Sequence, residues 1–352
     1  MFLDRLSMNL LNSIAENEIF QKTGLYEELR NRPIGFVDVG SLGGVHPFIL
    51  PVASLVNCLC FEPNEQASKE VCHVTKPTDF SRLTVYNTAI SNMASEAEFY
   101  ITKSEVNSSL LKPDKDFVRR YSVEGFTVEK TRTVRTQTLD DIAENAGRLY
   151  PNLAEIIKLD CQGAEYPILQ GASKVLENQC TVLWCEVEFF QIYENQKLFS
   201  DIDQLLRQKG FTLYGLYPNY ISSKQMDRKV FETEERIMWA DALYIKDPLS
   251  PMVKYLQFSE RSIKVLILAT MLLRYFDFTC ELIHAFIKDK SEKTRLIHLT
   301  EHLSLLRKKE IEKDTGALIL RCSKDQERMY LYAKKFIDKN KGNNNIDFIQ
   351  LN

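Results

Sequence analysis

The stretch Gly35-Phe-Val-Asp-Val-Gly-Ser-Leu-Gly-Gly44 decides the fold class, together with Phe61-Glu-Pro-Asn64, which follows it. An apolar run ending in a turn with three glycines, and then a second apolar strand ending in a carboxylate, is typical of an open α/β sheet that binds an adenosine-containing cofactor. Glycine allows a sharp turn and a close approach to a ligand. We expect Glu62 to accept hydrogen bonds from both ribose hydroxyls. The spacing predicts a nucleotide-type site without identifying the cofactor.

Composition indicates an ordinary globular protein. The 352 residues, 44% apolar and 26% charged, suffice for one large domain with an appendage or for two domains. The N-terminus does not resemble a signal peptide. The longest apolar run, Val265 to Leu273, is about half the length of a bilayer span and predicts a buried helix. Eight cysteines without a Cys-x-x-Cys motif indicate reduced thiols. We therefore expect a cytoplasmic protein with no membrane span.

The charge is distributed unevenly along the chain. A net charge of −3 gives no electrostatic reason to expect nucleic-acid binding. Residues 251–352 hold 19 Lys and Arg against 13 Asp and Glu, whereas residues 1–250 hold 26 against 35. This shift falls near Asp247–Pro251 and predicts a domain boundary there.

Strand and helix patterns alternate up to residue 245, which predicts one doubly wound α/β domain. Its last strands are expected to run antiparallel. The expected strands are Ile34–Val39, Cys58–Glu62, Leu83–Ile90, Glu98–Thr102, Phe126–Thr136, Ile156–Asp160, Thr181–Val187, Phe211–Leu216 and Met238–Ile245. Asn64 and Thr138 have the sequence context of helix N-caps. Beyond residue 250, leucines at steps of three and four predict an α-helical appendage.

These residues resemble the FkbM-type family of S-adenosylmethionine-dependent methyltransferases. The resemblance covers about residues 33–246 and is carried, in the family's order and spacing, by Val37-Asp-Val-Gly40, Phe61-Glu-Pro-Asn64, Thr138-Leu-Asp-Asp141, Ile157-Lys-Leu-Asp-Cys-Gln-Gly-Ala-Glu165, Leu169-Gln-Gly-Ala172, Glu186-Val-Glu188 and Ala240-Asp-Ala-Leu-Tyr244. It implies a class I, Rossmann-like fold whose seven-stranded, mostly parallel sheet ends in an antiparallel strand. It also implies S-adenosylmethionine as cofactor, and O-methylation of sugars and polyketide-type products.

The resemblance also decides between cofactors and sets the domain plan. A dinucleotide site would prefer Gly-x-Gly-x-x-Gly, whereas the chain has Gly40-x-x-Gly43-Gly44. We expect N-terminal helices in residues 1–32, a methyltransferase domain in 33–247, a C-terminal α-helical appendage in 251–340 and a frayed tail in 341–352. Residues 1–30 and 251–352 lie outside the resemblance and inherit no role from it.

The predicted cofactor residues gather at or just after the ends of four expected strands, Ile34–Val39, Cys58–Glu62, Leu83–Ile90 and Ile156–Asp160. Gly40 would allow close backbone approach, Asp38 would orient the loop or the methionine amino group, and Thr88 to Ile90 would line the adenine. The alternative for Gly40 and Asp38 is a plain strand-to-helix turn that binds no ligand. For Thr88 to Ile90 it is an ordinary strand end in the core. The full set is Asp38, Gly40, Gly43, Glu62, Pro63, Asn64, Thr88, Ala89 and Asp160.

Carboxylates supply the predicted catalytic residues, because a hydroxyl acceptor benefits from a base. They are Asp160, Glu165, Glu186 and Glu188, with His46 as a further candidate base. Glu165 could instead be a helix N-terminal charge, Glu186 and Glu188 strand-end charges facing water, and His46 a capping residue. No ligand spacing supports a metal, and His298 and His302 are expected at the surface.

The predicted function is methyl transfer from S-adenosylmethionine to a hydroxyl of a glycan, a sugar or a secondary metabolite. The alternative is a catalytically degenerate methyltransferase fold that serves as a scaffold, with the helical tail binding a partner. That tail could also form a homodimer. The segments Asn107–Leu111 and Phe189–Gln196 are expected to lie over the pocket and to shape the choice of substrate.

Overall fold

A seven-stranded sheet forms the centre of the protein. The computed structural model describes residues 11–146, 150, 152–223, 235–251 and 256–340, so the tail expected in 341–352 lies outside it. The strands, in spatial order, are β3 (Arg82–Tyr86), β2 (Val56–Phe61), β1 (Ile34–Val39), β7 (Ile156–Leu159), β8 (Val182–Glu188), β10 (Arg236–Ile245) and β9 (Thr212–Ile221). Within these residues, no helix is long and apolar enough to span a bilayer.

The directions of the strands confirm the predicted fold class. β3, β2, β1, β7 and β8 pair in parallel, whereas β10 runs antiparallel to both of its neighbours, β8 and β9. The strand order reverses at β1, which lies between β2 and β7. In open α/β sheets, ligands bind beyond the carboxyl ends of the strands at such a reversal. The sheet therefore directs the ends of β1, β2 and β7 toward one site.

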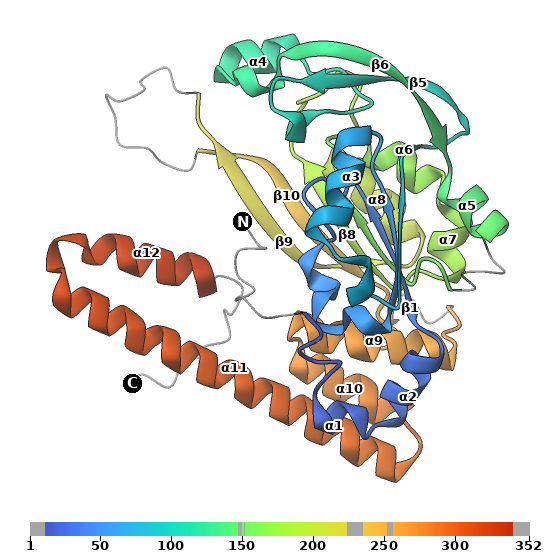
Figure 1. Cartoon of the computed structure of the whole chain (residues 1–352), viewed down its shortest axis with the longest axis vertical. Helices are drawn as coiled ribbons and strands as arrows, with labels where there is room; N and C mark the ends of the chain where they lie inside the picture. The colour runs from blue at the N-terminus through green and yellow to red at the C-terminus, as the bar shows by residue number, and fades with distance from the viewer. Residues whose placement is uncertain (1–10, 147–149, 151, 224–234, 252–255, 341–352) are drawn as a thin grey trace.

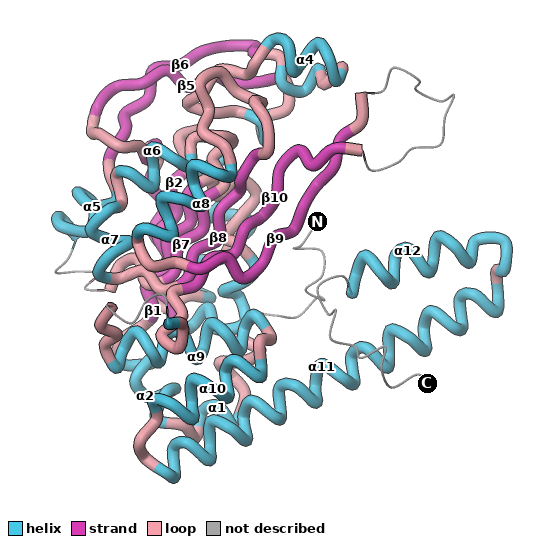
Figure 2. Tube along the Cα trace, turned by 180° about the vertical axis from the view of Figure 1, so that it is seen from behind, coloured by secondary structure: helices cyan, strands magenta, loops and turns pink. Residues whose placement is uncertain are grey.

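Helices cover both faces of the sheet (Figures 1 and 2). The face that carries Val37 and Val39 packs against the helices α5 (Leu139–Ala146), α6 (Glu165–Gln170), α7 (Ser173–Asn178) and α8 (Phe199–Gln208). The opposite face, which carries Ile34 and Phe36, packs against α2 (Gly24–Asn31), η2 (Pro47–Leu55), α9 (Glu260–Leu273) and α10 (Phe276–Phe286). Strands buried on both faces explain the continuous apolar runs in the sequence.

A second, three-stranded sheet arches over the carboxyl edge of the first (Figure 1). It contains β4 (Ala89–Ile90), β6 (Val128–Gln137) and β5 (Ser95–Thr102), and α4 (Lys115–Tyr121) lies beside it. The single strand predicted for Leu83–Ile90 is wrong, because β3 ends at Tyr86 and β4 pairs with β6 instead. The amide of Asn87 donates to the carbonyls of Glu62 and Pro63, which turns the chain between the two strands.

Two predicted helix starts are confirmed. Asn64 Oδ1 accepts the Gln66 N–H at the start of α3 (Glu65–Val74), and Thr138 Oγ1 accepts the Asp141 N–H at the start of α5. Such caps satisfy backbone donors that have no partner inside the helix. The cap residue of α3, Asn64, also donates its N–H to Glu62, so the start of this helix is tied to the end of β2.

The helices α9 and α10 share a hydrophobic core with the sheet. Val265, Leu268 and Leu282 are fully buried in the same cluster as Phe36 and Trp184. The buried helix predicted for Val265–Leu273 is thus confirmed as the second half of α9. The domain boundary expected near residue 250 stays a prediction, but α9 and α10 do not stand apart from the α/β fold as an appendage would.

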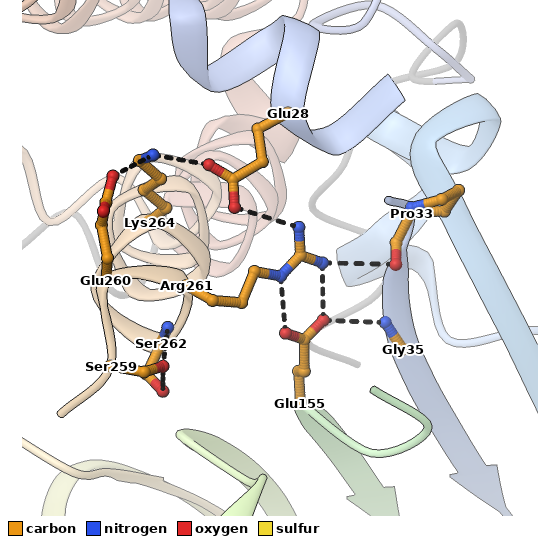
Figure 3. Close-up of polar contacts among 9 residues, drawn as sticks. All are labelled: Glu28, Pro33, Gly35, Glu155, Ser259, Glu260, Arg261, Ser262 and Lys264. Carbon is orange, nitrogen blue, oxygen red and sulfur yellow. Dashed lines mark hydrogen bonds and ion pairs between the residues drawn. The ribbon is translucent and has the colours of Figure 1, made fainter. Parts of the chain in front are cut away.

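A buried ion pair fastens α9 to the amino ends of β1 and β7 (Figure 3). Arg261 donates to both carboxylate oxygens of Glu155, over 2.8 Å in each case. The same guanidinium donates to the Pro33 carbonyl, and the Glu155 carboxylate accepts the N–H of Gly35. Planar two-point pairing of this kind fixes geometry as well as charge. The pair therefore sets how α9 lies against the first strand.

The last helices extend away from this core. The first part of α11 (Lys290–Lys324) buries Leu296, Leu299 and Leu303. Its carboxylate Glu292 accepts the N–H groups of Gly24 and Leu25, at the start of α2. Farther along, α11 and α12 (Met329–Asn340) form a protruding hairpin that exposes apolar side chains, among them Ile319, Leu320, Tyr330 and Ile337 (Figure 2). The homodimer expected through this region stays a prediction.

The ends of β1 and β7 meet at Gly40. This residue has φ +77°, and a Cβ built on it would lie 1.9 Å from the Asp160 carbonyl oxygen. The Asp160 N–H also donates to the Val39 carbonyl. Gly40 thus needs to be glycine for two reasons, its backbone conformation and the space that β7 occupies. Gly43 has φ +85° with nothing within 4 Å of such a Cβ, so only its conformation requires glycine.

Arg261→Ala is expected to lower the free energy of unfolding by about 3–5 kcal/mol, because it leaves the buried Glu155 carboxylate without its cation. Urea denaturation followed by circular dichroism measures this loss. Lys69→Ala is the control, since it removes an exposed pair with Glu65 and should change stability by about 0.5 kcal/mol or less. A loss below about 1 kcal/mol for Arg261→Ala contradicts the anchoring role.

Gly40→Ala and Gly43→Ala form a matched pair that separates crowding from backbone strain. Gly43→Ala should cost about 1–2 kcal/mol, the penalty for placing an L-residue in the left-handed region. Gly40→Ala carries the same penalty and also forces the strand ends apart, so its unfolding midpoint in urea should fall well below that of Gly43→Ala. Equal midpoints for the two variants would show that the strand ends separate freely.

Candidate active site

A cavity opens at the carboxyl edge of the sheet, between β1, β2 and β7 and beneath the β5–β6 arch. Its empty space, including the open mouth, is about 860 Å³. The sides that face the arch include Phe99, Glu105 and Leu110. Most of the predicted cofactor residues line this cavity, and we therefore call it the donor cavity. They are Gly40, Glu62, Pro63, Asn64, Thr88, Ala89 and Asp160.

Glu62 is the buried carboxylate of the donor cavity. Its Oε1 accepts the Asn64 N–H over 2.9 Å, and only 6% of the residue is exposed. Burial raises the pKa of Glu62 to about 7, against the opposing effect of the Asn64 N–H. A ligand with two adjacent hydroxyls would give this carboxylate the hydrogen bonds that burial withholds. The position and chemistry of Glu62 therefore fit the ribose of an adenosine-containing cofactor.

Asp38 lies below the glycine turn and does not line the donor cavity. Its Oδ2 accepts the His46 N–H over 2.8 Å, and its Oδ1 lies 3.2 Å from Lys158 Nζ. Asp38 is predicted to orient either the loop or the methionine amino group. These contacts are those of a residue that orients the loop. Lys158 Nζ also donates to the Gly40 carbonyl, over 2.6 Å. Burial disfavours the charged lysine, but the charges of Asp38 and Asp160 outweigh this and raise the pKa of Lys158.

A second cavity adjoins the first and shares a wall with it. Asp160 and Gln162 line both cavities. The second cavity is also lined by residues that do not border the first, namely Phe126, Glu186, Glu188, Tyr193 and Trp239. We call it the acceptor cavity. A third cavity, under the turn at Gly43 and His46, also reaches Asp160 and Glu186. Asp160 thus lies where the three spaces meet, and its side chain is 40% exposed. Gly43 faces this third cavity rather than the donor cavity.

Gln162 ties the shared wall together. Its Nε2 donates to Asp160 Oδ1 over 2.9 Å and to Glu186 Oε2 over 2.7 Å. Its Oε1 accepts a hydrogen bond from the Tyr193 hydroxyl, which also contacts the Asn107 carbonyl. The residue has φ +57°, an uncommon conformation for a residue with a side chain. Backbone strain of this kind persists only where the surroundings enforce it, as at functional sites.

Glu186 and Glu188 lie on the same face of β8, as their spacing predicts. They do not face water, since their exposed fractions are 7% and 2%. Burial, reinforced by neighbouring carboxylates, raises the pKa of each glutamate well above its usual value. A carboxylate with a raised pKa binds a proton more readily than an ordinary glutamate. The acceptor cavity therefore has the chemistry that general-base catalysis requires.

The structure corrects the expectation for Glu165. Its side chain is fully buried, its Oε1 accepts the Cys161 N–H over 2.6 Å, and it lines none of the three cavities. Burial raises its pKa to about 7. Glu165 therefore holds the turn after β7 and does not reach a substrate. His46 is also a poor base, because burial and the charge of Lys158 lower its pKa to about 3.

Sequence reasoning missed two residues of this site, Lys158 and Gln162. They connect the strand ends with each other, and Gln162 also contacts Tyr193, which lies in the segment predicted to cover the pocket. A lysine inside an apolar strand is the one signal that could have been noticed, because lysine is seldom buried without a partner. Among the described residues, no group of three or more His, Cys, Asp or Glu side chains is placed to bind a metal ion.

Comparison with known proteins shows what the chain is similar to. Among solved structures, the chain is similar to methyltransferase FkbM from Methylobacillus flagellatus KT, with 16% identity and a TM-score of 0.35, over 60% of this chain and 43% of that one. It is also similar to a putative S-adenosylmethionine-dependent methyltransferase from Listeria monocytogenes, with 11% identity and a TM-score of 0.30, over 63% of this chain and 98% of that one. The chain thus spans less than half the length of the first of these proteins. No curated protein sequence matches.

The sequence of the central region matches a family model. Residues 48–213 match the model described as the methyltransferase FkbM domain. The matched region runs from the helical segment after the glycine turn to the start of β9, and it includes Glu62, Asp160, Gln162 and Glu186. These residues line the donor cavity, the acceptor cavity or the wall that the two share. Over these residues the chain is similar to the methyltransferase FkbM domain.

Proposed function

We propose that this protein is an S-adenosylmethionine-dependent O-methyltransferase, and that its acceptor is a hydroxyl of a sugar, a glycan or a secondary metabolite. One observation carries the proposal. The Asp160–Gln162 wall borders both a cavity with a buried carboxylate suited to ribose and a cavity lined by further carboxylates. Two reactants bound on either side of this wall would meet at Asp160. Holding them in that arrangement is the main contribution that such a reaction needs from the protein.

The residues of the donor cavity fit the cofactor. Glu62 would accept hydrogen bonds from the ribose hydroxyls, and the turn at Gly40 brings backbone rather than a side chain to the cavity wall. Asp160 would place a negative charge near the sulfonium. When bound, S-adenosylmethionine supplies an electrophilic methyl group whose carbon–sulfur bond breaks, with the electron pair leaving on sulfur.

The acceptor cavity supplies a base for the hydroxyl. As the new oxygen–carbon bond forms, the acceptor oxygen must lose its proton, and we assign this proton to Glu186. Its Oε2 is held by Gln162, and its raised pKa makes it a stronger base than an ordinary glutamate. Asp160 shares the Gln162 amide and would orient the reacting groups. A hydroxyl keeps its proton at neutral pH, so an oxygen acceptor needs such a base.

The affinity for S-adenosylhomocysteine is expected to fall as the pH is lowered through about 7, because protonated Glu62 can no longer accept two hydrogen bonds. The limiting slope is about tenfold per pH unit. Isothermal titration calorimetry between about pH 5.5 and pH 8 measures it. Glu62→Gln should bind more weakly above pH 7 and lose the pH dependence. Glu65→Gln, at an exposed position of α3, is the control and should behave as the wild type. Absence of binding at millimolar ligand would sink the proposed function.

Labelled methyl groups should appear on an oxygen atom of the acceptor, and Glu186→Gln should slow this transfer by about 10²–10⁴-fold. The test incubates the protein with a methyl-labelled donor and fractionated extract, and identifies the labelled product by mass spectrometry. The wild-type rate should rise with pH, since the base acts in its deprotonated form. Label found on nitrogen or carbon would contradict the O-methyltransferase assignment. An unchanged rate for Glu186→Gln would contradict the role of that residue.

A further inference from the structure

The acceptor cavity has a one-sided charge. Asp160, Glu186 and Glu188 line it, and the described lining residues include no Lys, Arg or His. Of the two nearby cations, Lys158 lies 3.7 Å from Asp160 but borders the third cavity, and Arg236 is engaged elsewhere. Its guanidinium lies 3.8 Å from the centre of the Phe190 ring and donates to the Tyr121 hydroxyl. A ligand in this cavity would therefore meet hydrogen-bond acceptors and negative charge.

Glu188 is the deepest carboxyl group of this cavity. It is 2% exposed and borders the cavity beside the side-chain amide of Gln196, which favours its charged form. A buried carboxyl group that ionises needs more than one donor to offset the loss of water. Glu186, by contrast, already receives the Gln162 amide at short distance. Glu188 is therefore the carboxyl group that would gain most from a cationic donor of the ligand.

Aromatic rings complete the lining of the acceptor cavity. Phe126, Tyr193 and Trp239 all border it, and the rings of Phe126 and Tyr193 lie 5.9 Å apart. The Tyr193 hydroxyl is held by Gln162 and Asn107. Aromatic faces attract cations, most strongly where water is excluded, and they also stack on the apolar faces of sugar rings. Carboxylates and aromatic rings in one cavity together favour a protonated amine.

The methionine part of the donor does not account for these carboxylates. The glycine turn borders the donor cavity at Gly40 and the third cavity at Gly43 and Gly44, but none of these glycines lines the acceptor cavity. Glu188 and Tyr193 lie on the far side of the Asp160–Gln162 wall from Glu62. A donor bound at Glu62 with its tail along the glycine turn would leave Glu188 free for the acceptor.

We propose that the acceptor carries a protonated amine close to the hydroxyl that is methylated, as in an amino sugar or an amino alcohol. The ammonium group would donate to Glu188 and lie against the aromatic rings, and the neighbouring hydroxyl would face Glu186. Anionic acceptors, such as sugar phosphates, would be repelled by the three carboxylates. This inference rests on the proposed function, because it assigns the chemistry of the acceptor within the same site.

Ionisation of the glutamates gives the proposal a second readout. Neighbouring acids, namely Asp160, Glu165 and Asp241, raise the pKa values of Glu186 or Glu188 further than burial alone does. An ammonium group between them would offset this repulsion and favour the charged carboxylate. Its binding should therefore release protons from the protein. A neutral ligand of the same shape should release none.

Three fragments of matched shape test the proposal on the full-length protein saturated with S-adenosylhomocysteine. They are trans-2-aminocyclohexanol, cyclohexanol and trans-2-hydroxycyclohexanecarboxylate. We expect the amine to bind about tenfold or more tightly than cyclohexanol, and the carboxylate not to bind. Calorimetry in two buffers of different ionisation enthalpy should show proton release for the amine only.

Variants identify the residue responsible. Glu188→Gln should weaken the binding of trans-2-aminocyclohexanol by about tenfold and leave that of cyclohexanol unchanged. Glu194→Gln is the matched control, since this glutamate lies in the loop that follows β8 but pairs with Lys112 at the surface. If S-adenosylhomocysteine itself fails to bind, the proposed function falls. If it binds, but the amine shows no advantage or no fragment binds at about 10 mM, only the present inference is overturned.

Discussion

The close contact between the ends of β1 and β7 determines the geometry of the whole site. Gly40 has no side chain, and the Asp160 carbonyl occupies the space where a Cβ would lie. Lys158 then reaches from β7 to the Gly40 carbonyl and to Asp38, and Asp38 in turn holds the first N–H of the next segment at His46. Each of these contacts depends on the one before it. The turn that borders the donor cavity and the carboxylate that borders all three cavities are thus parts of one rigid unit.

Buried carboxyl groups surround this unit, and they serve two different purposes. Glu165 uses its carboxylate to satisfy a backbone N–H and stays away from the cavities. Glu62, Glu186 and Glu188 line cavities instead, and burial raises the pKa of each. Burying acids in this way opposes folding whenever they are ionised. Active sites commonly carry such costs because the perturbed groups are the reactive ones. Glu165 shows that a perturbed carboxyl group alone does not mark a catalytic residue.

The strands of the large sheet could be predicted well because each one repeats a local pattern. The bounds of β1 agree with the expected Ile34–Val39, and the capping residues Asn64 and Thr138 act as their types suggest. The break between β3 and β4 could not be predicted, because it depends on contacts of Asn87 with the β2 end and on pairing with β6. Gln162 was missed for the same reason. Its partners Asp160, Glu186 and Tyr193 come together only in the folded chain.

The contact of Glu292 with the start of α2 has a consequence for how the protein folds as it is made. Gly24 and Leu25 receive their carboxylate cap from a residue 267 or more positions later in the chain. The apolar face of β1 likewise waits for α9, whose Arg261 pairs with Glu155. Contacts of such large sequence separation form slowly. While the ribosome is still adding residues, the first helices lack their cap and the part of this face that α9 and α10 cover stays exposed. Completion of the fold is therefore tied to the late synthesis of α9 to α11, and the nascent chain presents a surface that chaperones can recognise.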